Sequence, residues 1–136
     1  MKSAFVFAGA VALVAAGALS APAVAHHSFA AEFDAKKPVV VDGVITKVQL
    51  VNPHSWIYVD VKDASGKVTN WGFEFGSPIG LRSAGITRAD VKPGTKVRIA
   101  GYRAKNGGPF GYTSVIRLPD QRTVTVGAAV PPPKID

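Results

Sequence analysis

The ten residues from position 52 to 61, NPHSWIYVDV, constrain the fold of this chain more than any other stretch. Pro53 fixes its own φ and restricts the residue before it, so the stretch begins with a turn. The residues after the turn alternate as a half-buried strand does. One face holds Ile57, Val59 and Val61, and the other holds Trp56, Tyr58 and Asp60. We therefore expect a strand that buries its aliphatic side chains and carries two large aromatic rings on its outer face.

Further short strands are predicted on both sides of this one. They cover residues 39–50, with Gly43 as a bulge or bend, and then 68–75, 96–103, 111–118 and 123–126. One or two short helical pieces are expected within 77–91, where Ser77-Pro78 and Thr87 are possible helix starts. Three strands, a helix and two or three more strands is the order of an OB-fold. The sequence thus predicts a mainly β protein, a small five- to six-stranded antiparallel OB-like barrel, and an immunoglobulin-like sandwich is the alternative.

The first 25 residues have the features of a secretory signal peptide. Lys2 is followed by an apolar run, and Ala23-Val24-Ala25 offers a small-x-small cleavage site. Cleavage after Ala23 is an alternative, and so is an uncleaved anchor, although Pro22 and the missing basic flank argue against an anchor. We expect a periplasmic or secreted protein that is cut after Ala25 and keeps no stable membrane span.

The mature chain is predicted to hold one domain. An N-terminal arm covers residues 26–37, the barrel covers 38–127, and a disordered Pro-rich tail covers 128–136. In the arm, Phe29 and Phe33 are four residues apart and could cover the outer rings Trp56 and Tyr58. If the arm lies there, no aromatic face is left open to a ligand.

Composition excludes some chemistry and indicates possible partners. The chain has no Cys, so disulfides, thiol catalysis and thiolate metal sites are excluded. Its formal charge of +7, one less without Lys2, is compatible with an anionic envelope component such as lipid head groups or acidic polysaccharide. Export argues against nucleic acid as the partner, and the charge could also serve only to keep the protein in solution.

Three histidines suggest a metal site. Cleavage after Ala25 would free the α-amine of His26, which can chelate a metal together with its own imidazole, while His27 and His54 supply further nitrogen ligands. Such a nitrogen set suits Cu(II), Zn(II) or Ni(II), with copper favoured by the affinity order. The alternative is that His26 and His27 are a solvated chain end and that His54 packs beside Trp56.

A second candidate site needs no metal. OB-folds bind ligands on the outer face of their second and third strands, and here Trp56 and Tyr58 could stack on a sugar or a base. The predicted ligand-binding residues are Trp56, Tyr58, Glu74 and Arg103. An interaction protein without a small ligand is the third hypothesis. Since no nucleophile motif, paired carboxylates or phosphate loop is present, the sequence favours a binding module over an enzyme.

Several of these stretches together resemble one protein family. They are HHSFAAEFD, NPHSWIYVDV, WGFEFGSP, KPGTKVRIAGYRAKNGG and SVIRLPD. The chain is similar to a family of small exported proteins of Gram-negative bacteria that carry a domain of unknown function. The resemblance implies an OB-like barrel and implies no activity, substrate or cofactor. The positions that fit its pattern are His26, His27, Asn52, Pro53, His54, Trp56, Trp71 and Glu74. Two departures are Gln121, where a Gly is usual in the last turn, and Ile79-Gly80 in the expected helix.

Overall fold

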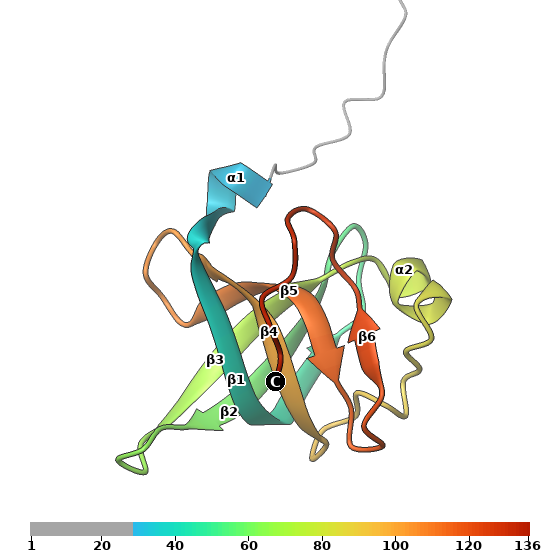
Figure 1. Cartoon of the computed structure of the whole chain (residues 1–136). Coiled ribbons are helices and arrows are strands. Elements are labelled where there is room, and N and C mark those ends of the chain that lie inside the picture. The colour runs from blue at the N-terminus through green and yellow to red at the C-terminus, as the bar shows by residue number, and fades with distance from the viewer. Residues whose placement is uncertain (1–28) are drawn as a thin grey trace, which may run out of the picture.

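The structure, a computed structural model, describes residues 29–136. The predicted signal peptide and the two histidines His26 and His27 lie outside this part of the chain. The elements are α1 (Phe29–Glu32), β1 (Phe33–Gln49), β2 (Ser55–Lys62), β3 (Val68–Phe75), α2 (Pro78–Ser83), β4 (Lys96–Ala104), β5 (Phe110–Arg117) and β6 (Thr123–Thr125) (Figure 1). The predicted order of three strands, a short helix and three further strands is confirmed.

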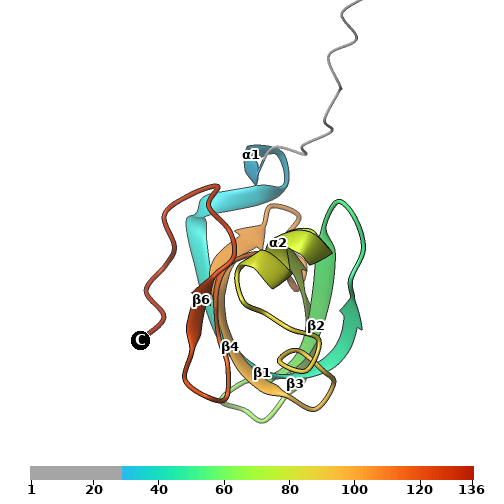
Figure 2. The same ribbon diagram turned by 90° about the vertical axis from the view of Figure 1, so that its right-hand side faces the viewer.

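The six strands form one sheet that closes on itself. Their order is β3-β2-β1-β4-β5-β6, and each neighbouring pair is antiparallel. An additional pairing between β3 and β5 completes the ring, which Figure 2 shows from one end. This closing pair is parallel and so departs from the all-antiparallel expectation. A five-stranded ring with this order is an OB-like barrel, as predicted.

Strand β1 begins earlier than the sequence suggested. It starts at Phe33, inside the stretch predicted as an arm, and its pairing with β4 is irregular between Phe33 and Pro38. That irregularity accommodates a proline, which has no N–H to give to a ladder. Gly43 lies where β1 approaches β2 closely, because an added Cβ would be 3.0 Å from the Val59 Cβ and from the Asp60 main-chain oxygen. The register shift between β1 and β2 lies between Ile45 and Lys47, two residues after the bulge or bend expected at Gly43.

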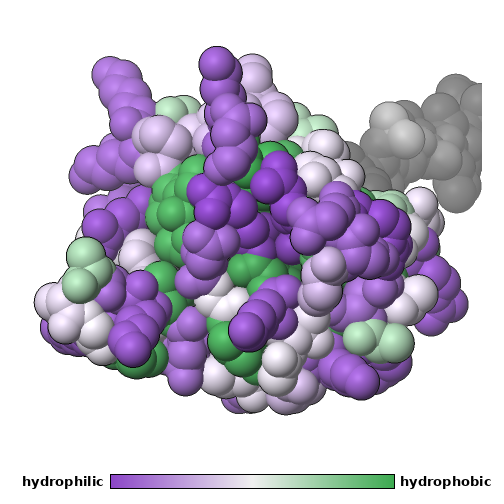
Figure 3. Space-filling model, turned by 60° about the horizontal axis from the view of Figure 1, so that its bottom comes forward, coloured by the Kyte–Doolittle hydropathy of each residue, from purple (hydrophilic) through white to green (hydrophobic). Residues whose placement is uncertain are grey.

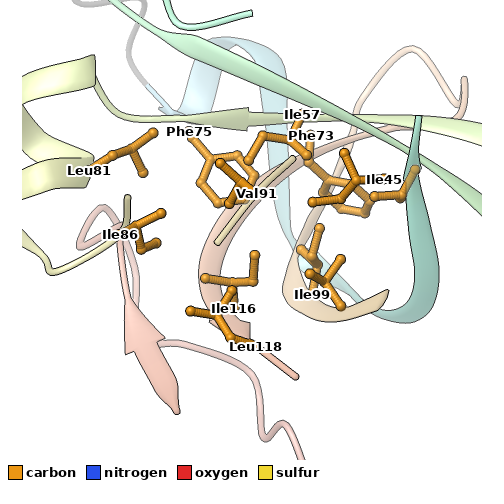
Figure 4. Packing of buried hydrophobic residues seen from close by; sticks show 12 residues of the cluster. Ile45, Ile57, Phe73, Phe75, Leu81, Ile86, Val91, Ile99, Ile116 and Leu118 are labelled. Carbon is orange, nitrogen blue, oxygen red and sulfur yellow. The ribbon is translucent and has the colours of Figure 1, made fainter. Parts of the chain in front are cut away.

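The barrel is filled by the aliphatic and aromatic faces that the alternation predicted. Ile57, Val59 and Phe73 are fully buried, and Phe75 is nearly so. Leu81 and Ile86, from α2 and the segment after it, join the same cluster and close one end (Figure 4). Burial of each such side chain stabilises the fold by about 1.5–3 kcal/mol.

Helix α2 forms despite its Ile79-Gly80 pair. Ser77 is the N-cap, and its Oγ accepts a hydrogen bond of 3.1 Å from the N–H of Gly80. Pro78 occupies the first helical position, where a missing N–H costs nothing. Cap and proline together compensate for the weak helix formers.

The tail after β6 lies against the barrel. The hydroxyl of Tyr102 donates to the Pro131 carbonyl, and Nη2 of Arg98 donates to the main-chain oxygen of Asp136 at 2.8 Å. The prediction of a disordered tail did not anticipate these contacts, which depend on side chains of β4. Within residues 29–136 the structure has no helix long and apolar enough to cross a membrane.

Candidate functional site

The outer faces of β2 and β3 lie side by side in an antiparallel register. Trp56 lies opposite Glu74, and Tyr58 lies opposite Gly72. Asp60 lies opposite Asn70, whose amide donates to the Asp60 carboxylate at 2.8 Å. The hairpin turn explains this register, since the Asp63 carboxylate accepts from the main-chain N–H groups of residues 65 and 67 and fixes where the two strands begin to pair.

Gly72 makes room on this face for an aromatic ring from β5. A Cβ at position 72 would lie 2.9 Å from Cδ1 of Phe110 and 3.1 Å from Cε1 of Tyr58. Phe110 meets Trp56 edge to face with 6.3 Å between ring centroids, and Trp56 stacks beside Tyr58 at 6.4 Å. Three rings from two strands far apart in sequence therefore form one aromatic row.

A pocket of about 630 Å³ opens beside this row, at the end of the strands next to α1. Its aromatic lining is Phe33, Trp56 and Phe110, and its other lining residues are Ala31, Glu32, Ala104, Lys105 and Asn106. A mostly apolar hollow with a few polar groups and a volume of roughly 300–1,000 Å³ is typical of small-ligand sites. The row and the pocket are referred to below as the aromatic pocket.

Tyr58 is the most constrained ring of the row. Its hydroxyl donates to Oε1 of Gln49 at 3.2 Å, and Nζ of Lys47 lies 5.4 Å from the ring centroid. Lys47 thus occupies one side of the Tyr58 ring. Since Tyr58 does not line the pocket, Trp56 and Phe110 are the rings of the row that a ligand there would meet.

The rings of Phe29 and Phe33 do not cover Trp56 and Tyr58. Phe29 packs edge to face on Tyr102 and Tyr112, with centroid distances of 5.6 and 5.1 Å. Phe33 contacts Tyr112 at 5.6 Å and forms a wall of the pocket. The expected cover was therefore wrong, because tyrosines from β4 and β5 offered the two phenylalanines a different aromatic surface.

His54 and Glu74 form a pair at the edge of the aromatic row. Nδ1 of His54 lies 3.0 Å from Oε1 of Glu74, and the Glu74 residue is only 8% exposed. Glu74 is held from both sides, since it lies opposite Trp56 on β2 and beside Tyr112 on β5. A carboxylate fixed in this way holds the imidazole in one orientation.

Arg103 does not lie with the other predicted ligand-binding residues. Its guanidinium is over the ring of Trp71 at 5.3 Å, and Nη2 donates to the Gly107 carbonyl at 2.8 Å. Trp71 packs on the hydrophobic core and not on the outer face. Arg103 therefore holds the β4–β5 loop over the barrel, and the structure separates it from Trp56, Tyr58 and Glu74.

Metal ligands are not gathered in the part of the chain that the structure describes. Among residues 29–136 there is no group of three or more His, Asp or Glu side chains that could hold a metal ion. Of the three predicted ligands only His54 lies there, and its partner is one carboxylate. His26 and His27 precede the described residues, so the convergence of the three histidines stays a prediction.

Sequence reasoning missed three residues that shape the pocket, namely Phe33, Phe110 and Asn106. Phe110 directly follows Gly-Gly-Pro and lies between this loop and the strand predicted at 111–118. The available signal was Gly72, an outward-facing residue without a side chain between two aromatic residues, Trp71 and Phe73, that face the core. Only the parallel pairing of β3 with β5 brings Phe110 over it.

Comparison with known proteins gives a family and no activity. Residues 13–113 match a family described as a family of unknown function (DUF6152). No curated protein matches the chain, and no solved structure matches it. The match spans α1 through the first half of β5 and therefore includes every residue of the aromatic pocket.

Proposed function

The chain belongs to the family DUF6152, whose function is unknown, and we propose that it is a binding module that holds a ring-bearing small ligand beside Trp56. The observation that carries the proposal is the pocket of about 630 Å³ walled by Phe33, Trp56 and Phe110. Phe110 is 37% exposed, so an aromatic surface is open to a ligand at the pocket. Stacking on such rings suits the apolar face of a sugar unit or an aromatic ring.

Polar groups at the pocket would orient the ligand. Oδ1 of Asn106 already accepts from the N–H of Gly108 at 2.9 Å, so its amide NH₂ is the group left to donate. Lys105 is held by α1, because its Nζ donates to the Ala30 carbonyl and its N–H donates to the Glu32 carbonyl. The pocket therefore keeps its shape without a ligand, which lowers the cost of binding.

Tryptophan fluorescence tests this proposal. The chain has two tryptophans, so Trp71→Phe leaves Trp56 as the only one. Glucose, N-acetylglucosamine and indole serve as three ring-bearing probes. We expect a saturable, one-to-one change of Trp56 emission with at least one probe, and at least tenfold weaker binding after Phe110→Ala. The matched control is Ile79→Ala, which truncates another exposed apolar side chain, 72% exposed and on α2. No saturable change with any probe, or equal loss in both variants, would refute the proposal.

A metal site at His54 is the second candidate function. A histidine ligand commonly gives its other ring nitrogen to a carboxylate, and Glu74 accepts from Nδ1 of His54 in this way. Nε2 of His54 would then face the metal. Phe29 is two residues after His27, and its ring lies 5.1 Å from Tyr112, the neighbour of Glu74 on β5. Two residues span up to about 7 Å and three up to about 11 Å, so the proposal has His27 and His26 within reach of His54.

This second candidate also includes export, because only cleavage after Ala25 frees the α-amine of His26. The apolar run and small-x-small site before His26 support it. Calorimetric titration of Cu(II) and Zn(II) into protein that begins at His26 is the test. We expect one-to-one binding that weakens on acidification, since imidazole and amine must be neutral to bind. Binding unchanged by His54→Ala, and by one extra residue before His26, would rule this site out.

A further inference from the structure

A second hollow lies at the other end of the strands from the aromatic pocket. It has a volume of about 710 Å³ and is lined by Asp42, Gly43, Val44, Asp60, Lys62, Lys96, Val97, Arg98, Arg117, Leu118, Pro119 and Gln121. Arg117 and Phe110 are at opposite ends of β5, about 23 Å apart at about 3.3 Å per residue. Binding at one hollow is therefore separable from binding at the other. Figure 3 shows this face, where hydrophilic side chains surround a hydrophobic area.

Positive charge exceeds negative charge in this hollow, which is called the basic groove below. Four cationic side chains, those of Lys62, Lys96, Arg98 and Arg117, line it with two carboxylates. Arg98 pairs with the Asp42 carboxylate at 2.6 Å. Within the described residues, the other three cations have no ion pair. The groove thus offers at least three positive groups without an acidic partner.

Two of the cations are neighbours across the sheet. Arg98 on β4 and Arg117 on β5 are direct partners in the antiparallel ladder. Arg98 is already held by the Asp42 carboxylate and by the main-chain oxygen of Asp136, so Arg117 is the member of this pair without an acidic partner in the described residues. An anion bound beside Arg117 would supply one, because a guanidinium fork holds carboxylate or phosphate oxygens well.

The cations follow the rim of the barrel from one strand to the next. Strands β5, β4, β1 and β2 are consecutive neighbours, and strands lie about 4.8 Å apart. Arg117 on the first and Lys62 on the last are therefore separated by about 14 Å along the sheet. A single phosphate is too small to contact cations spread over this distance, whereas a linear polymer with repeated anionic groups can contact several of them.

The shape and lining of the groove select the class of polymer. Its lining holds no aromatic side chain, although proteins that bind single-stranded nucleic acids stack bases on aromatic rings. Lys62 and Lys96 are exposed and Arg98 and Arg117 are half-buried, so the positive groups extend from the rim of the hollow into it. The geometry points to a linear acidic polysaccharide, bearing carboxylate or phosphate groups, as the ligand of the basic groove.

Polygalacturonate, a linear polycarboxylate, is the probe that tests this inference, with neutral dextran as the matched polymer. We expect binding of polygalacturonate and none of dextran. The groove variant Lys62→Gln/Arg117→Gln should bind at least tenfold more weakly, and its affinity should depend less on salt concentration. The control variant Lys36→Gln/Arg82→Gln removes the same charge at exposed positions outside the groove and should change the affinity by no more than about twofold.

Competitors separate this ligand from other anions. Inorganic phosphate, mixed-sequence single-stranded DNA and vesicles of anionic phospholipid are each added to the complex with polygalacturonate. Displacement by millimolar phosphate, or groove-dependent binding of DNA or vesicles tighter than that of polygalacturonate, would overturn the inference. So would equal effects of the groove and control variants. Trp56→Ala should leave polygalacturonate binding unchanged, which distinguishes this site from the aromatic pocket.

Discussion

Gly72 is the single residue on which the aromatic pocket depends most directly, because the Phe110 ring lies where a side chain at position 72 would be. We expect Gly72→Ala to lower the free energy of unfolding by about 1–3 kcal/mol, the usual cost of overpacking. Urea denaturation measures the loss. The variant should also weaken any ligand of the pocket, since Phe110 has to move away from Gly72.

A double-mutant cycle checks the cause of that loss. In a Phe110→Ala background the ring is absent, so Gly72→Ala should cost less than about 1 kcal/mol there. The contact of a new Cβ with Tyr58, at 3.1 Å, accounts for the remainder. An equal cost in both backgrounds would mean that Phe110 does not occupy the space over Gly72.

Gln121 has a strained backbone at the position where the family resemblance led us to expect a Gly. Its φ is +70°, the left-handed region that favours glycine, and the turn around it keeps hydrogen bonds between residues 118 and 122 and between 118 and 121. We expect Gln121→Gly to raise the free energy of unfolding by up to about 1 kcal/mol. Gln121→Ala is the control, because alanine is also disfavoured at this φ. Thermal unfolding measures the change, and an equal rise of the midpoint temperature in both variants would contradict a backbone cause.

At the scale of elements, helix α2 depends on its cap. Ser77→Ala removes the acceptor of the Gly80 N–H and should cost about 1 kcal/mol. Ser83→Ala makes the same chemical change at an exposed position at the end of the helix and should cost little. Denaturation midpoints compare the two, and equal losses would show that the cap is not the stabilising feature.

The segment after α2 is joined to the β5–β6 turn by one arginine. Arg122 donates to the Asp90 carboxylate at 2.6 Å and to the Gly85 carbonyl at 3.1 Å. The N–H of Thr87, its hydroxyl and the Arg122 guanidinium hold the pKa of Asp90 below its ordinary value of 3.8. The carboxylate therefore stabilises the fold fully above that ordinary value, and the contribution is lost as pH falls through the lowered pKa.

Acidification should accordingly remove the effect of Asp90→Asn. At pH 6 the variant loses the charged acceptor of Thr87 and Arg122 and should be less stable by about 1 kcal/mol, as for a lost helix cap. The difference should shrink as the pH falls below 3.8, because the wild-type carboxyl is then increasingly protonated. Urea denaturation at pH 6 and at pH 2.5 measures both. A difference that grows on acidification would contradict the assigned direction of the pKa shift.

Strands were predictable where neighbouring residues in the sequence carry the signal. The alternation within 52–61 and the expectation of a strand at 68–75 correctly predicted two strands, β2 and β3, which pair in the structure. The start of β1 was not predictable, because Pro38 normally ends a strand. Its place in the sheet depends on the irregular pairing with β4, which lies some 60 residues further along the chain.

At the scale of the whole molecule, the barrel was predictable from element order and the pocket was not. The pocket joins α1, β2 and β5, and it exists only because β3 and β5 pair in parallel. The prediction that Arg103 lies with the other ligand-binding residues failed for a related reason. In the structure its guanidinium lies over Trp71 and donates to the Gly107 carbonyl of the β4–β5 loop. Long-range pairing therefore decides which of the predicted residues meet.

Two of the hollows of the molecule thus differ in chemistry and lie at opposite ends of its strands. One is aromatic and lies beside α1, and the other is basic and is bordered by the β5–β6 turn. Since the His54–Glu74 pair lies next to Trp56, any metal bound there would be near the aromatic pocket and far from the basic groove. The basic groove can consequently be tested independently of the other two proposals on one protein.

The most direct single measurement is a map of amide and indole chemical shifts, recorded by NMR during titration with the three ring-bearing probes. Binding in the aromatic pocket predicts shifts that gather on the Trp56 indole and on the amides of Asn106 and Phe110. Residues 117–121 of the basic groove should stay unchanged. Shifts scattered over the surface, or confined to the groove, would contradict the assignment of this protein as a module that binds its ligand beside Trp56.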